Sequence, residues 1–211
     1  MKITELQTVP PKDSLGLLNT NSDRVAAMLK AAKPLPNSNY YYAVIPSTGY
    51  QSNIYDKNVC LLSPDKQLIG KLDIQIHDKE AYVQGLEIAK EYRGQGLATS
   101  LYGIVLSILK LTLISDSSQT PMGARTWVSL SKIPGVEVRG LVYHPTEEQK
   151  KVLGATQLSN AAYTFPVTVM DNTIVPANSS ETKLYTPDRN GFKLIAFYNK
   201  RGNKNDSNRM E

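Results

Sequence analysis

Residues 86–102 have the sequence LEIAKEYRGQGLATSLY. An apolar strand end leads through a turn with two glycines into a run whose apolar residues stand at 97, 101, 104, 105, 108 and 109. This spacing is that of one helix face. The first amides of a helix have no partner inside the helix and carry the positive end of its dipole. The segment therefore predicts an anion site, to which Arg93 adds a fixed positive charge.

Two other glycine-rich phosphate motifs do not fit this turn. A dinucleotide fingerprint requires Gly or Ala three residues after Gly96, where this chain has Thr99. A P-loop requires Gly-Lys-Ser/Thr after four intervening residues, and the chain has no such run. The pattern that fits is Arg-x-x-Gly-x-Ala at 93–98, preceded by Leu86-x-Ile88.

This combination resembles the acetyl-CoA loop of the GNAT superfamily of N-acetyltransferases, which has the form Gln/Arg-x-x-Gly-x-Gly/Ala between a strand and a long helix. The resemblance implies an α+β fold with a mixed, mostly antiparallel sheet flanked by helices. It also implies direct transfer of an acetyl group from acetyl-CoA to an amine, and it does not identify the acceptor. The residues implied to bind the cofactor are Leu86, Ile88, Arg93, Gly94, Gln95, Gly96, Leu97, Ala98 and Thr99.

The resemblance also implies a mechanism on the strand before the loop. Its backbone near Ile88 is expected to line the thioester, where an amide would face the acetyl carbonyl oxygen. Members of the superfamily often use a carboxylate on this strand as general base, and Glu87 is the only carboxylate between Ala81 and Ile88. The alternative is that Glu87 is a solvated strand residue or a salt-bridge partner on the sheet.

The general acid of the superfamily has no clear counterpart. Many members place a tyrosine on a later helix to protonate the leaving thiolate, and Trp127 stands about there. An indole donates a hydrogen bond but does not titrate, so packing is the favoured role for Trp127. Tyr92 and Tyr102 are the candidates to replace the tyrosine, although Tyr102 lies on an apolar helix face that favours the core.

The flanking segments predict the elements of this fold. Asn21 begins a helix that ends before Pro34, because Asn, Ser and Asp side chains cap helix amides. A turn at 63–66 joins two strands into a hairpin. A helix is expected at 120–130, and strands are expected at 40–45, 58–62, 67–77, 81–88, 111–115, 136–143 and 193–198.

The chain is predicted to hold one domain with additions. An N-terminal arm covers 1–20, the GNAT-like domain covers 21–199, and a basic polar tail covers 200–211. Within the domain, 146–182 is an insertion, with a short helix at 146–153 and a strand at 163–169. The insertion and the tail are the candidate surfaces for a protein partner.

Composition excludes several classes. One cysteine and two histidines allow neither an intramolecular disulfide nor a Cys/His metal site, so no metal is expected. No apolar run reaches the roughly 18 residues of a membrane span, and no signal peptide is evident, which predicts a cytoplasmic protein without a membrane partner. The net charge is +5, but the basic residues are dispersed, so a nucleic-acid partner is not expected.

A second class of function stays open at this point. Several spaced residues loosely resemble those of GNAT-like proteins encoded by phages, and that resemblance carries no chemistry. It allows a catalytically degenerate interaction protein or virion structural protein of a phage, which would be found in the virion. The residues concerned are Asp116, Gln119, Thr120, Gly123, Trp127 and Leu130.

Overall fold

The computed structural model describes residues 18, 20–47, 56–116, 120–170, 173–177 and 192–199. The predicted arm, apart from residues 18 and 20, and the predicted tail at 200–211 lie outside the described residues, as does 178–182 of the insertion. The chain divides into two compact units. Unit 1 comprises 1–74 and 84–101, and unit 2 comprises 75–83 and 102–211.

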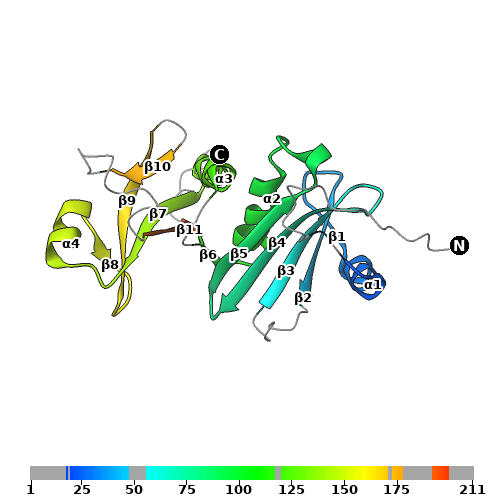
Figure 1. Cartoon of the computed structure of the whole chain (residues 1–211), viewed down its shortest axis with the longest axis horizontal. Coiled ribbons are helices and arrows are strands. Elements are labelled where there is room, and N and C mark those ends of the chain that lie inside the picture. Colours follow the sequence, from blue (N-terminus) through cyan, green and yellow to red (C-terminus); the bar gives the residue numbers. More distant parts are fainter. Residues whose placement is uncertain are drawn as a thin grey trace, which may run out of the picture. The chain divides into compact units, whose positions relative to one another are not determined.

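Unit 1 is built on antiparallel strands. In the sheet the order is β1 to β5, and Figure 1 shows these strands side by side with α1 and α2. A turn in which the Lys66 amide donates to the Ser63 carbonyl separates β3 from β4, so the predicted hairpin is confirmed. The end of β4, the start of β5 and the turn between them, residues 75–83, belong to unit 2. The bounds are α1 (Ser22–Ala31), β1 (Lys33–Pro34), β2 (Tyr41–Pro46), β3 (Asp56–Leu62), β4 (Leu68–His77), β5 (Glu80–Ile88), a 3-10 turn η1 (Lys90–Tyr92) and α2 (Leu97–Gly103).

Helix α1 begins where the sequence predicts. The Asn21 side chain accepts a hydrogen bond of 3.0 Å from the Arg24 amide, which is the N-cap interaction expected of this residue. Met28 then buries its side chain against Ala43 and Cys60, together with Ile45. This helix therefore covers the sheet face on which the even-numbered residues of β3 lie.

The other face of the same sheet packs closely against α2. A Cβ added to Gly70 of β4 would lie 2.7 Å from Ile88 Cδ1 and 3.3 Å from Leu101 Cδ1, with Leu61 Cβ at 3.5 Å. Gly70 is thus the residue that lets the end of β5 and the start of α2 approach β4. Ile88 points toward α2, and its neighbour Glu87 points to the α1 face because side chains alternate along a strand.

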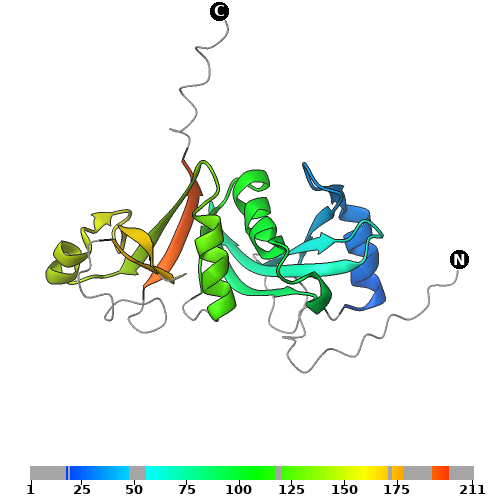
Figure 2. The ribbon, with the colours of Figure 1, turned by 90° about the horizontal axis from the view of Figure 1, so that it is seen from above.

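Unit 2 contains a parallel pair of strands, β5 with β6. The sheet order is β5-β6-β11-β7-β9-β10, and β8 pairs with β9. Figure 2 shows β11 beside β7 although fifty residues separate them in the sequence. The bounds are a π-helical turn η2 (Ile104–Ile108), β6 (Thr112–Ile114), α3 (Pro121–Leu130), β7 (Val136–Tyr143), α4 (Glu147–Leu153), β8 (Thr156–Gln157), β9 (Ala162–Met170), β10 (Thr173–Pro176) and β11 (Lys193–Tyr198).

The predicted insertion forms part of this sheet. Strand β9 pairs antiparallel with β7, and Phe165 is fully buried over Gly140. A Cβ on Gly140 would lie 2.1 Å from Phe165 Cζ, so only glycine leaves room for the ring. Phe165 also packs against Phe192, with 5.2 Å between the ring centroids. The insertion therefore supplies core residues, and the predicted α+β class with a mixed, mostly antiparallel sheet flanked by helices is confirmed.

Candidate cofactor and catalytic site

The loop after β5 turns because of two glycines. The 3-10 turn closes with a hydrogen bond of 2.9 Å from the Tyr92 amide to the Ala89 carbonyl. Gly94 and Gly96 then adopt φ angles of 79° and 76°, which L side chains rarely adopt. These two residues reverse the chain so that α2 begins at Leu97.

The amides of this loop are free to bind a ligand. The first bond of α2 runs 3.1 Å from the Ser100 amide to the Gly96 carbonyl. Within the described part of the chain, no hydrogen bond is found for the six amides at 94–99. A Cβ at Gly94 or Gly96 would meet no atom within 4 Å, so the space beside this backbone is open. Backbone amides beside such open space can bind an anion.

The Arg93 side chain contacts the end of β5. Its Nε donates a hydrogen bond of 2.9 Å to the Ile88 carbonyl, and this contact is partly buried. In the preceding turn, the Ala89 amide donates at 2.8 Å to the Ile69 carbonyl of β4. None of the ion pairs found among the described residues includes Arg93.

Gln95 connects the loop to the far side of the sheet. Its Oε1 is 3.4 Å from the Tyr40 hydroxyl, which donates, and its Nε2 donates at 3.4 Å to the Glu91 carbonyl. Both contacts are long, and the two residues are exposed or half-buried. Tyr40 precedes β2, and the sequence analysis did not connect it with the loop because 55 residues separate it from Gln95.

Strand β5 has an open edge next to the loop. It pairs in parallel with β6 only at Glu80–Tyr82, and among the described residues no β6 partner is found for 83–88. This open edge consists of the backbone groups of 83–88 that point away from β4. Leu86 is half-buried and Ile88 is buried, so both predicted residues lie at this edge.

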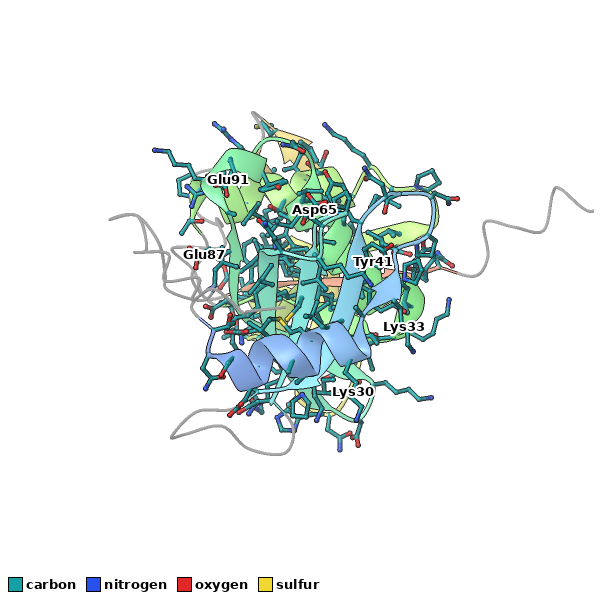
Figure 3. The ribbon with its side chains drawn as sticks, turned by 90° about the vertical axis from the view of Figure 1, so that its right-hand side faces the viewer. Lys30, Lys33, Tyr41, Asp65, Glu87 and Glu91 are labelled. Atoms are coloured by element: carbon teal, nitrogen blue, oxygen red, sulfur yellow. The ribbon has the colours of Figure 1, made fainter. Side chains whose placement is uncertain are left out.

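Glu87 is a buried carboxylate. Its exposed fraction is 6%, so its interpretation as a solvated strand residue is wrong. Figure 3 shows it on the β5 side of the sheet, below Glu91 of the following turn. The structure thus brings Glu87, Ile88 and Arg93 together at the end of one strand, with the carboxylate on the α1 face and Ile88 on the α2 face.

A buried polar network occupies the α1 face in unit 1. The Arg24 guanidinium donates to the Asn58 side chain, and Asn58 Nδ2 donates to Asp73 Oδ1 at 2.5 Å. Lys71 Nζ lies 3.5 Å from the same Asp73 oxygen. Burial raises the pKa of Asp73, although the nearby Lys71 charge opposes this shift. The sequence signal for this network, charged residues inside an otherwise apolar strand, was present at 71 and 73 but was not used.

Trp127 and the candidate acid Tyr102 pack in the core of unit 2. Trp127 is 1% exposed and its ring centroid lies 5.5 Å from that of Tyr102, which is also buried. Burial raises the pKa of the Tyr102 hydroxyl. These contacts confirm the packing role expected of Trp127 and the core position of Tyr102. Tyr92, in unit 1, is half-buried on the 3-10 turn.

The residues that the structure describes contain neither a candidate metal site nor a candidate membrane-spanning helix. Within those ranges, no group of three or more His, Cys, Asp or Glu side chains is arranged to hold a metal ion. Of the helices described, none has the length and apolar character needed to cross a bilayer.

Comparison with known proteins locates the family resemblance. Residues 27–112 match the model of the acetyltransferase (GNAT) family. This segment is similar to the GNAT family. The GNAT match includes β2 to β5, the loop at 93–99 and α2, and it confirms the resemblance predicted from the loop. No curated protein sequence matches the chain.

Solved GNAT acetyltransferases share low identity with the chain. A chimera of Vibrio cholerae spermidine N-acetyltransferase with hSSAT is 16% identical, with 52% of this chain and 65% of that chain covered and a TM-score of 0.32. An IAA acetyltransferase from Bacillus cereus is 9% identical, with 68% and 78% covered and a TM-score of 0.36. A mutant of the Vibrio cholerae spermidine enzyme is 14% identical, with 71% and 68% covered and a TM-score of 0.36. The chain thus spans just under two thirds of the first of these proteins.

Proposed function

We propose that the chain is an acetyl-CoA-dependent N-acetyltransferase that transfers the acetyl group directly to an amine. The observation that carries the proposal is the row of six amides at 94–99, for which no partner is found among the described residues. These amides lie beside open space and inside the segment that matches the GNAT family. Members of this family bind acetyl-CoA and an amine acceptor. A diphosphate carries the negative charge that such a row of amides stabilises.

The cofactor residues have distinct roles in this proposal. The amides of 94–99 and the Thr99 hydroxyl bind the diphosphate. The open edge of β5 binds the arm that carries the thioester, through the backbone of Leu86 and Ile88. The Ile88 amide then stabilises the oxygen on which negative charge develops during attack.

Glu87 is the proposed general base. The acceptor amine gives a proton to the Glu87 carboxylate, directly or through water, as its nitrogen attacks the thioester carbon. The new carbon–nitrogen bond forms while the carbon–sulfur bond breaks, and the thiolate leaves. Because Glu87 and Ile88 point to opposite faces of β5, the amine approaches from the α1 face.

Calorimetry of the full chain tests the proposal. Acetyl-CoA is expected to bind with a micromolar dissociation constant, which is about −8 kcal/mol. NADH, which has a diphosphate but no thioester arm, is the control ligand and is expected to bind at least tenfold more weakly. Absence of acetyl-CoA binding at millimolar concentration would overturn the proposal and favour the alternative of an interaction protein.

A further inference from the structure

We propose that Arg93 is a positioning residue that fixes the last peptide of β5, and so sets where the cofactor arm leaves the strand and the diphosphate enters the loop. The inference rests on the proposed function. It assigns the Arg93 side chain a geometric task, beyond the charge that the sequence pattern suggests.

The peptide between Ile88 and Ala89 is held at both ends. Its N–H donates at 2.8 Å to the Ile69 carbonyl of β4, and its C=O accepts at 2.9 Å from Arg93 Nε. No cis peptide bond is present in the described chain, and in a trans peptide the C=O and N–H point in opposite directions. Arg93 therefore sits on the side of β5 away from β4, which is the open edge.

This position divides the open edge into two parts. The backbone groups of a strand residue point to the same side, and those of the next residue point to the other. The Ile88 amide and the Leu86 groups therefore face the open edge and remain available to a ligand. The Ile88 carbonyl faces the same edge but is already bonded to Arg93. A bound arm must consequently end its pairing with β5 at Ile88.

Arginine suits this task better than lysine. A guanidinium presents five donors in a rigid plane, so Nε can bond the carbonyl while the terminal nitrogens point elsewhere. For those terminal nitrogens, no hydrogen bond is found in the part of the chain that the structure describes. Arg93 directly precedes Gly94, with which the loop begins. One side chain thus joins the end of the arm site to the beginning of the diphosphate site.

Substitution of Arg93 by lysine distinguishes the geometric role of the Arg93 side chain from the effect of its charge. Arg93→Lys keeps the positive charge but loses the Nε donor, and Lys90→Ala removes an exposed charge from the same turn as a control. The probes are acetyl-CoA and adenosine 3′-phosphate 5′-diphosphate, which lacks the arm. Arg93→Lys is expected to bind acetyl-CoA roughly tenfold more weakly, the effect of about 1.4 kcal/mol, and the nucleotide within threefold of the wild type. Equal affinity of Arg93→Lys and wild type for acetyl-CoA would overturn the inference.

Hydrogen exchange without any cofactor gives an independent readout. The Ala89 amide is expected to exchange several-fold faster in Arg93→Lys than in the wild type, while Lys90→Ala leaves it unchanged. Unchanged protection of Ala89 in Arg93→Lys would also reject the inference. If the wild type bound neither probe, the proposed function would fail, and the exchange experiment would still decide whether Arg93 fixes this peptide.

Discussion

A buried carboxylate on a central strand loses its hydration, so its charge has to be compensated by its surroundings or used. Glu87 is in this position, and Asn58, Lys71 and Asp73 lie on the same face of unit 1. Polar side chains in the middle of a covered sheet break the usual apolar pattern of a core. Such local conflicts are expected at functional sites, which supports the role proposed for Glu87.

Replacement of Glu87 by glutamine is expected to lower kcat by roughly 10²- to 10⁴-fold, the usual contribution of a general base. The amide keeps the size of the side chain but does not accept the amine proton. The measurement is acetyl transfer to a panel of primary amines as a function of pH. Glu91→Gln, on the exposed turn that follows, is the control and should keep wild-type activity. Full activity of Glu87→Gln at every pH would remove this residue from the mechanism.

The burial of Glu87 could not be predicted from its strand. Alternation places Glu87 and Ile88 on opposite faces, and a single polar residue between apolar ones usually marks a solvated face. The structure nevertheless buries Glu87, which is 6% exposed. The loop glycines were predictable because their requirement is local, whereas the cover over Glu87 depends on tertiary packing.

At the scale of the element, the loop conformation should be sensitive to its glycines. Gly94→Ala and Gly96→Ala are each expected to lower the free energy of unfolding by about 1–2 kcal/mol, because a side chain is strained at positive φ. Steric overlap does not add to this cost, because a Cβ at either glycine would meet no atom within 4 Å. The measurement is urea unfolding.

Gly103→Ala is the matched control for the loop glycines. Gly103 has helical angles, with φ −58° and ψ −38°, and open space for a Cβ. The substitution is expected to raise the free energy of unfolding by roughly 0.5–1 kcal/mol, because alanine loses less backbone entropy in a helix. Destabilisation by all three substitutions alike would contradict the conformational argument.

Strands β7 and β9 approach each other closely where Gly140 pairs with Phe165. Gly140→Ala is expected to lower the free energy of unfolding by about 1–3 kcal/mol or more, because its Cβ would overlap the Phe165 ring. The same urea experiment measures it. Adding Phe165→Leu should recover part of the loss, and a double variant less stable than Gly140→Ala alone would show that the overlap is not the cause.

Element prediction succeeded where capping and periodicity act locally. The start of α1, the hairpin at 63–66 and the strands β7, β9 and β11 follow from such signals. The two-residue strands β1 and β8 and the short strand β10 were not predicted, because their pairing is set by a neighbouring strand. The long helix after the loop was predicted, but its change to π-helical bonding at Ile104–Ile108 was not. Apolar spacing does not distinguish the two bonding patterns at this length.

At the scale of the whole molecule, three buried or partly buried groups predict loss of stability in alkali. Burial raises the pKa of Cys60 from 9.0 to about 12, and it raises those of Tyr82 and Tyr102 as well. Between pH 9 and 12 the unfolded chain has lost the Cys60 proton while the folded chain keeps it. The unfolded state then binds fewer protons, so the free energy of unfolding falls as pH rises.

The measurement is the urea midpoint from pH 7 to pH 11. It is expected to be flat up to about pH 8 and then to fall, because the free energy of unfolding decreases by about 1 kcal/mol per pH unit for one such group. Cys60→Ala should delay the fall toward the range in which the tyrosines of the unfolded chain ionise. A midpoint that stays constant to pH 11 would show that these groups ionise equally in both states.

The position of β11 has a consequence for synthesis of the chain. Strand β11 pairs with β6 on one side and with β7 on the other, so each of those strands lacks one of its two native neighbours until residues 193–198 exist. A chain growing from its N-terminus on the ribosome must hold both strands with exposed edges while about fifty further residues are added after β7. Exposed edges recruit other strands. Released chains that end within 144–192 should therefore need a chaperone, while released chains that include residues 193–198 should not.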